Sequence, residues 1–323
     1  MLQIEFTAED VARTRFAVSP LWEVVACLRV LRGADEQGLH RRWVEQVRPR
    51  IAAAGLDLTP LSRLVPMPTD SIPGFLVPPP TTPQPSLAVE LATLRATPYA
   101  SLRTTSDRAR PGVDALREDP ERGLGRLADT IGAFWEVALA PYWPRIRTLL
   151  EGDILYRATR FAEGGARRLF DDLDPQVGWD AGALRMVHRR ARGERRLDGQ
   201  GLLLVPSAFI WPRIFSTVAS GVGQPTLRYP PRSLGDLWQP RRTTAPEALA
   251  AVIGRSRALL LAELTAPAAT KELARRTGLT PGGVSQQLTA MRSAGLVTAH
   301  RTGRLVLYAR TSVAETLLTA AAD

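Results

Sequence analysis

The sequence of 323 residues predicts an α+β chain that is mainly helical. A helical N-terminal domain with a small antiparallel sheet precedes a C-terminal domain of two short helices and a hairpin. Three observations lead to this prediction. Apolar residues recur at helical spacing over 123–170, apolar runs bounded by Gly and Pro occur between 201 and 229, and helix caps followed by period-two alternation occupy 270–310. We place the domains at 1–240 and 241–323.

The first helices are predicted from their caps and apolar stripes. Thr7 to Asp10 can cap a short helix, and Pro20 can open a second helix with one apolar face. Residues 38–51 are also expected to be helical. Residues 59–85 contain many prolines, which exclude a helix or a central strand, so we expect an extended connection packed on the surface. A ligand for a proline-binding partner is the alternative.

The most regular helical pattern spans 123–170. Its apolar stripe is interrupted at Pro141 and Pro144 and then resumes, with Glu151 and Arg157 among the charged residues expected on the outside. These helices are expected to form the core of the N-terminal domain. The small sheet is expected from three strand-like runs, at 201–205, 208–211 and 226–229.

Four aromatic residues of this domain could line a pocket for an apolar small molecule, and ordinary core positions are the alternative. These residues are Trp135, Tyr142, Trp143 and Trp211.

The C-terminal pattern begins with two short helices. Thr270 can cap the first helix, and Gly278 can end it in the left-handed conformation. Thr280 can cap the second helix, Pro281 suits its first position, and Gly295 can close it. The buried stripe expected on the second helix consists of Val284, Leu288 and Met291.

The opposite side of the second helix has short or amide-bearing side chains and no apolar anchor. A Gln amide can bond two edge atoms of adenine, and free N–H groups at a helix N-terminus suit a phosphate, so we predict binding in the major groove of DNA. After this helix, apolar residues recur at every second position on both sides of residues 301–304. This alternation predicts a two-stranded hairpin with arginines at its tip. The residues predicted to contact DNA are Thr280, Gly282, Ser285, Gln286, Gln287, Thr289, Arg292, Arg301, Thr302 and Arg304.

These residues have different predicted tasks. Gln286 and its neighbours would meet bases or adjoining phosphates, Arg292 would hold the DNA backbone, and the hairpin tip would lie in or beside the minor groove. Gln287 points nearer the rim of the helix, so its contact is a weaker expectation.

Several linked motifs resemble the winged helix-turn-helix of the ArsR family of bacterial repressors. They are Glu272–Ala274, Val284–Leu288, Ala294–Val297 and Gly303–Tyr308. The resemblance implies that 246–264 and 313–322 form outer helices that pair two subunits, and that the homodimer binds a two-fold operator as a repressor.

This sequence departs from that family at two positions. Family members usually have Ser, Thr or Ala where Gly283 stands, and often His where Gln287 stands. The Gly282–Gly283 pair also loosens the first turn by about 1 kcal/mol per Gly relative to Ala. DNA affinity or sequence preference is therefore expected to be altered.

Residues 1–240 resemble the domain of unassigned function that precedes an ArsR-type module in many actinobacterial regulators. The resemblance rests on phrases such as Phe16–Trp22, Leu203–Ser207 and Pro225–Pro230. It supports the pairing of the two domains but supplies no ligand. Because a DNA-binding module needs about 80 residues, the roughly 240 additional residues suggest sensing, dimerisation or both. We expect this domain to sense an unknown small-molecule effector that is not a metal.

No metal, cofactor or enzyme activity is predicted. Metal-sensing members of the family use clustered Cys or paired His, whereas this chain has only scattered candidates, Cys27, His40, His188 and His300. The sequence also has no Gly-x-Ser-x-Gly elbow, phosphate loop or His-Glu metal pair.

The net charge of +10 is divided between the two domains. From Thr243 onward nine basic residues stand against five acidic ones, so +6 belongs to the longer N-terminal part. Basic surface favours phosphate backbones and predicts binding that weakens with salt. The dense basic run at 185–196 could contact DNA or an anionic effector, or form a solvated hairpin.

One cysteine and the lack of a signal peptide or long apolar run predict a cytoplasmic protein that does not enter a membrane. Two alternatives to a DNA-binding regulator stay open. One is an interaction or dimerisation protein whose winged helix no longer binds DNA, and the other is an enzyme that uses a cleft in the N-terminal domain.

Overall fold

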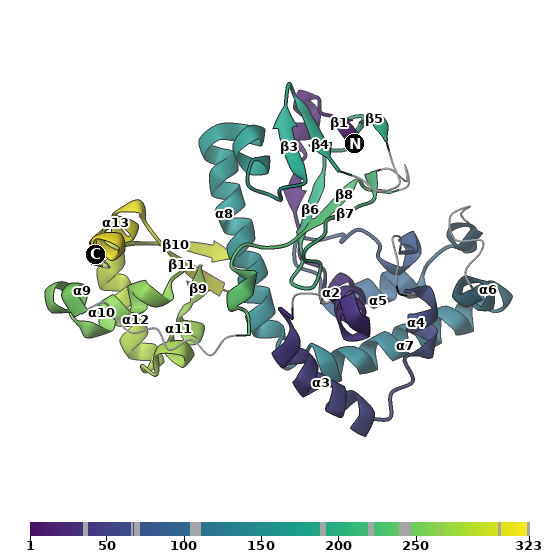
Figure 1. The fold of residues 1–323 in the computed structure, drawn as a ribbon, viewed down its shortest axis with the longest axis horizontal. Helices are drawn as coiled ribbons and strands as arrows, with labels where there is room; N and C mark the ends of the chain where they lie inside the picture. Colours follow the sequence, from purple (N-terminus) through teal and green to yellow (C-terminus); the bar gives the residue numbers. More distant parts are fainter. Residues whose placement is uncertain are drawn as a thin grey trace. The chain divides into compact units, whose positions relative to one another are not determined.

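The computed structural model divides into two compact units (Figure 1). Unit 1 contains Met1–Ile146 and Arg157–Arg232, and unit 2 contains Arg147–Tyr156 and Ser233–Asp323. The predicted boundary at 240 and 241 lies outside the described residues. The structure describes residues 1–34, 38–65, 67, 72–103, 111–187, 192–218, 223–238, 247–265, 267–302 and 305–321.

Unit 1 contains two four-stranded sheets. In order across the first sheet, the strands are β3 (Val177–Asp180), β4 (Ala183–Met186), β1 (Leu2–Glu5) and β5 (Gly193–Arg196). In order across the second sheet, they are β2 (Arg15–Phe16), β6 (Leu203–Pro206), β8 (Thr226–Tyr229) and β7 (Phe215–Ser216).

The prediction of an antiparallel sheet is wrong, because both sheets are mixed. β1 pairs antiparallel with β4 but parallel with β5, and β6 pairs parallel with both β2 and β8. The predicted strand at 208–211 forms turns instead. The parallel pairs join segments far apart in the chain, and alternation within one segment contains no information about such partners.

The inner faces of the two sheets share one core. Leu2 and Ile4 of β1 belong to the same buried cluster as Leu227 and Tyr229 of β8. These positions alternate along their strands, as period-two side-chain geometry requires. The core of unit 1 therefore includes both sheets as well as the helices.

Eight α-helices are described in unit 1 or shared with unit 2, and most agree with the predicted pattern. Thr7 forms a reciprocal capping box with Asp10 on α1, and Ser19 caps α2, in which Pro20 is the first residue. The helices are α1 (Ala8–Ala12), α2 (Pro20–Arg29), α3 (Arg41–Ala53), α4 (Thr59–Leu64), α5 (Leu87–Arg95), α6 (Pro111–Glu118), α7 (Pro120–Ala138) and α8 (Trp143–Phe170).

Two predictions about the helices are wrong. α4 lies in the proline-rich stretch that was expected to be extended, since Pro60 stands in the first turn, where its missing N–H costs no hydrogen bond. Glu151 and Arg157 of α8 are buried rather than outside. Each has an oppositely charged partner, since Glu151 accepts from Arg147 at 2.7 Å and Arg157 donates to Asp172 at 3.0 Å.

Polar side chains hold the first turn of α2, a helix that is buried along its whole length. Glu90 of α5 accepts from the Ser19 hydroxyl at 2.6 Å and from the Leu21 N–H at 2.7 Å. Glu23 of α2 accepts the Ala208 N–H with both oxygens. These contacts join α2 to α5 and to the segment after β6.

Arg228 of β8 lies above the ring of Trp22, a residue of α2, with the guanidinium carbon 4.5 Å from the ring centre. Its Nη2 donates to the Val77 carbonyl at 2.9 Å. Burial lowers the pKa of Arg228 to about 10 even though the nearby Glu90 opposes this effect. One arginine and two glutamate side chains therefore lie buried inside unit 1, Glu23 on α2 and Arg228 and Glu90 next to α2.

Unit 2 contains five described helices beyond residue 246 and one three-stranded sheet of order β10-β11-β9. Its core combines the predicted stripe of α12 with residues of α10, α11 and β10, among them Leu261, Leu273 and Val297. The elements are α9 (Glu247–Ile253), α10 (Arg255–Glu263), β9 (Ala268–Ala269), α11 (Thr270–Thr277), α12 (Pro281–Ser293), β10 (Val297–Thr302), β11 (Leu305–Arg310) and α13 (Ser312–Ala320).

Within the described parts of both units, no helix combines the length and the apolar character needed to cross a membrane.

Candidate nucleic-acid interface

The candidate interface begins with two helices joined by a short turn. Gly278 ends α11 in the left-handed conformation, with φ of 73°, as predicted. Thr270 does not cap α11, because it is already helical and the extended residue before it is Ala269, which makes no side-chain cap bond. The turn then leads directly into α12.

The N-terminus of α12 is built as predicted. The Thr280 hydroxyl accepts the Gly283 N–H at 3.1 Å, and Pro281 occupies the first turn. On the inner side Val284, Leu288 and Met291 are buried in the core of unit 2. This packing fixes which side of α12 faces outward.

Five of the predicted DNA-contacting residues share the outward side of α12. They are all exposed, and they are Gly282, Ser285, Gln286, Thr289 and Arg292. The Thr289 hydroxyl donates to the Ser285 carbonyl at 2.9 Å. Gln286 and Arg292 make no side-chain hydrogen bond within the described residues. The outward side of α12 thus presents amide, hydroxyl and guanidinium groups to a partner.

Gln287 does not belong to this group. It is half-buried, and its Oε1 accepts from Arg257 Nε of α10 at 2.8 Å. At 100° per residue, Gln287 points about 160° away from Thr289. The structure therefore places Gln287 between α12 and α10, away from the exposed face.

The hairpin after α12 is formed by β10 and β11, which pair antiparallel. Arg301 is exposed and pairs in register with Val306, whose side chain is 38% exposed. Thr302 pairs with Leu305 through the backbone, but its side chain lies outside the described residues, as does all of Arg304. The predicted hairpin is present, and β9 adds a third strand that alternation did not predict.

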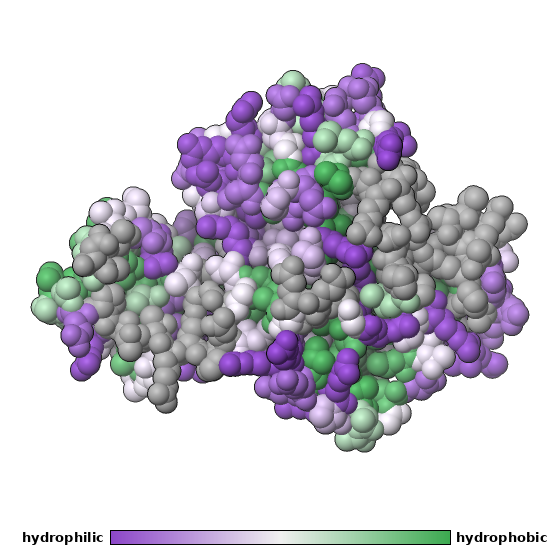
Figure 2. Space-filling view, viewed as in Figure 1, coloured by the Kyte–Doolittle hydropathy of each residue, from purple (hydrophilic) through white to green (hydrophobic). Residues whose placement is uncertain are grey.

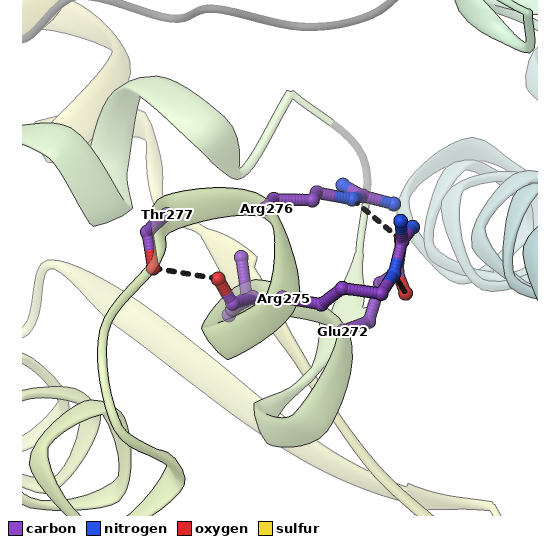
Figure 3. A network of polar contacts seen from close by, with 5 residues as sticks. Glu272, Arg275, Arg276 and Thr277 are labelled. Carbon is purple, nitrogen blue, oxygen red and sulfur yellow. Dashed lines mark hydrogen bonds and ion pairs between the residues drawn. The ribbon is translucent and has the colours of Figure 1, made fainter.

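A charged network on α11 was missed at the level of sequence (Figure 3). Glu272 Oε1 accepts from Arg275 Nη2 at 2.6 Å and from Arg276 Nε at 2.8 Å, and Glu272 Oε2 accepts from Arg275 Nε at 3.0 Å. The spacings of three and four residues are those of neighbours on one helix face, so this signal was available.

The electrostatics of this network follow from its geometry. Burial on its own would raise the pKa of Glu272, but the hydrogen bonds from Arg275 and Arg276 outweigh burial and lower it. The carboxylate therefore stays ionised and balances one of the two guanidinium charges. One positive charge remains, and Arg275 is exposed to solvent.

The four aromatic residues predicted to line a pocket in unit 1 do not all come together. Trp135 and Trp143 meet edge to face with ring centres 5.0 Å apart, and the hydroxyl of the adjacent Tyr142 donates to Gln46 at 2.8 Å. Trp211, which precedes a cis proline, makes no ring contact with these three in the described structure. The packing of Trp135 against Trp143 joins the end of α7 to the start of α8.

The basic run at 185–196 is not a simple hairpin, because β1 lies between β4 and β5. Two of its arginines face carboxylates, Arg185 with Asp180 at 3.1 Å and Arg196 with Glu5 at 2.9 Å. Residues 188–191, which include His188, lie outside the described residues. Elsewhere in the described chain, no three His, Cys, Asp or Glu side chains form a group that could hold a metal ion.

Comparison with known families identifies one segment. Residues 256–299 match the model of the bacterial regulatory protein, arsR family. The matched segment runs from α10 through α11 and α12 into β10, and it contains all of the outward side of α12. No curated protein and no solved structure gave a significant match to this chain. Unit 2 thus contains an ArsR-type helix-turn-helix, which is typical of DNA-binding transcriptional regulators.

Proposed function

We propose that this chain is a sequence-specific transcriptional regulator that binds double-stranded DNA as a homodimer and represses transcription. The observation that supports this function most strongly is the outward side of α12. Gln286 and Arg292 stand exposed there on a helix whose opposite side is fixed in the core. A rigid helix with unused polar groups matches the requirements of major-groove recognition.

The residues of the interface have three tasks. Gln286, Ser285 and Thr289 contact base edges, where hydrogen bonds distinguish one base pair from another. Thr280 and Arg292 hold phosphates on either side, and Gly282 lets the helix backbone approach closely. The hairpin acts as the wing, and Arg301, Thr302 and Arg304 lie in or beside the minor groove.

The charge of the helix-turn-helix agrees with this division. Glu272 neutralises only one of its two arginine partners, and Lys271 is exposed on the same helix as Arg275. Phosphate neutralisation by such groups releases counterions, so DNA affinity falls steeply with salt.

The homodimer forms through the outer helices of unit 2. α9 exposes Val252 at 82%, and α13 exposes Val313 at 56% and Leu317 at 36%. Figure 2 shows hydrophobic surface, in green, over the region of α9. Both α9 and α13 pack against α10, and apolar residues that remain exposed on such outer helices suit a subunit interface. A two-fold dimer would place two copies of α12 on two half-sites.

The N-terminal domain regulates this binding in the cytoplasm. An effector that binds unit 1 changes DNA affinity only if it prefers one arrangement of the two recognition helices. Trp135, Tyr142 and Trp143 are the side chains we assign to an apolar effector. We expect deletion of 1–240, which also removes the Arg147–Tyr156 segment of unit 2, to change operator affinity or effector response. A truncated chain that keeps both unchanged would contradict this role.

A second candidate function is a protein-interaction module that no longer binds DNA. The Gly282–Gly283 pair favours it, since two glycines loosen the first turn of the helix that would enter the groove. This candidate predicts affinity for an apolar protein partner that changes little with salt.

Selection of binding sites from a pool of random duplexes, using the full-length native chain, tests the proposed function. We expect enrichment of one sequence with two-fold symmetry, and reduced transcription in vitro from a promoter that contains it. Lack of enrichment of any sequence would contradict DNA recognition, and enrichment without reduced transcription would contradict repression alone.

A further inference from the structure

The hydroxyl of Thr289 donates its proton within α12, which leaves it only as an acceptor toward a partner. Its Oγ1 lies 2.9 Å from the Ser285 carbonyl oxygen, one turn earlier. A carbonyl oxygen can only accept, so the hydroxyl proton lies between the two oxygens. What Thr289 presents to solvent is therefore a pair of acceptor lone pairs, together with its methyl group.

Thr280, at the start of the same helix, has the opposite polarity. Its Oγ1 accepts the Gly283 N–H at 3.1 Å, so the hydroxyl proton is not used by this bond. Thr280 can donate this proton to a phosphate oxygen, which is an acceptor only. The two threonines thus differ in what they present to DNA. The backbone uses the acceptor of Thr280 and the donor of Thr289, so Thr280 can still donate and Thr289 can only accept.

Thr289 also occupies the middle of the exposed face. On a helical projection it lies between Gln286 on one flank and Arg292 on the other, and all three side chains are exposed. A side chain at the middle of a helix face that enters the major groove meets base edges, whereas the longer side chains on the flanks can reach either base edges or phosphates.

Resting on the proposed function, we propose that Thr289 recognises an exocyclic amino group in the major groove, N6 of adenine or N4 of cytosine. These two groups are the hydrogen-bond donors that bases present in this groove, and the N7, O6 and O4 atoms are acceptors. An acceptor on the protein pairs only with the donors. Thr289 therefore specifies adenine or cytosine at one position of each half-site.

Two other contacts compete with this assignment. A phosphate oxygen would face the lone pairs of Thr289 and be repelled, unless the bond to Ser285 were broken. The Thr289 methyl group could instead contact the methyl group of thymine. The two base contacts differ in the DNA atom that matters, an amino group in one and a methyl group in the other.

DNA duplexes that lack a single amino or methyl group distinguish these contacts. The probe is the duplex enriched by the native full-length chain, in which each adenine is replaced in turn by purine, each cytosine by 2-pyrimidinone and each thymine by uracil. Affinity is measured for the native chain and for the Thr289→Val and Thr289→Ser variants. Valine has the same shape without the hydroxyl, and serine has the hydroxyl without the methyl group.

We expect one amino group per half-site whose removal weakens binding by the native chain about five- to tenfold. Thr289→Val should lose a similar factor in affinity for the intact duplex, and its affinity should not change when that amino group is removed. Thr289→Ser, which keeps the hydroxyl, should keep the sensitivity of the native chain to that removal. The proposal would be overturned if the affinity losses from Thr289→Val and from removal of the amino group were additive. It would also be overturned if only the replacement of thymine by uracil had an effect that depends on Thr289. Failure of the native chain to enrich any duplex would contradict the proposed function itself.

Discussion

Arg257 of α10 donates from Nε to Oε1 of Gln287 at 2.8 Å, and this bond distinguishes Gln287 from the preceding Gln286. Because a guanidinium has no acceptor, the oxygen of Gln287 must face Arg257. Gln286, the preceding residue, is exposed and makes no side-chain hydrogen bond within the described residues. The two amides therefore have different tasks, one between helices and one toward a partner.

Replacement of each glutamine by alanine should separate these tasks. Gln286→Ala removes an exposed amide that can bond adenine at two atoms, so affinity for the enriched duplex should fall about tenfold or more. Gln287→Ala should leave that affinity within about twofold and instead lower the stability of unit 2 by about 0.5–1 kcal/mol. Equal losses of DNA affinity would contradict the assignment.

Replacement of Gly282 by alanine should move stability and DNA affinity in opposite directions. A Cβ at Gly282 meets open space, so the substitution should stabilise α12 by about 0.5–1 kcal/mol. The added methyl group stands on the outward side, where it would hold the helix away from DNA and weaken binding.

Gly283→Ala is the matched control for that experiment. Its Cβ would lie 3.1 Å from the Thr280 hydroxyl, so the cap must shift and little stability should be gained. Thermal unfolding and duplex titration measure both effects. A more stable Gly282→Ala variant with native DNA affinity would show that the first turn does not lie against DNA.

The buried side chains of Glu23 and Glu90 should make unit 1 less stable as pH rises. Burial raises the pKa of Glu23 to about 8 and that of Glu90 to about 7, from an ordinary value of 4.5. Folding therefore favours the protonated forms. This contribution is fully present below pH 4.5 and is lost as pH rises through about 7 to 8.

Denaturant unfolding followed by tryptophan fluorescence from pH 5 to 9 measures this slope. Glu23→Gln is uncharged throughout and should show a smaller loss of unfolding free energy than the native chain. The exposed Glu9 provides the control, since Glu9→Gln should keep the native slope. A Glu23→Gln variant with the native slope would contradict the assignment to Glu23.

Dimer formation should depend on the exposed apolar residues of α13. Leu317→Asp should shift the chain toward the monomer, because a carboxylate in an apolar interface loses its hydration. Val89→Asp removes an apolar side chain of similar exposure, 46%, from unit 1 and should leave the association constant unchanged. Sedimentation equilibrium measures both, and a Leu317→Asp chain that stays dimeric would exclude this interface.

The sequence predicted elements whose signals are local. The capping box of Thr7 with Asp10, the cap at Thr280 and the left-handed Gly278 each depend on a few consecutive residues, and the structure confirms them. The cap at Thr270 was predicted one residue too late, because an alanine without a capping side chain can also occupy that position.

Long-range contacts explain what the sequence did not predict. The place of β1 between β4 and β5 depends on partners about 180 to 190 residues apart in the chain. Arg157 was expected on the outside because it is charged. Its partner Asp172, which makes its burial possible, lies beyond the end of α8 and was not recognised. The same limit applies to the candidate site, where Gln287 has the spacing of a rim residue and only the folded position of Arg257 reveals its bond.

The most direct test of DNA recognition is the affinity of the full-length chain for the enriched duplex and for a scrambled duplex of equal length, across a salt series. We predict a preference of about a thousandfold or more for the enriched duplex and a linear fall of log affinity with log salt. Equal affinity for the two duplexes, or binding that does not change with salt, would contradict the account.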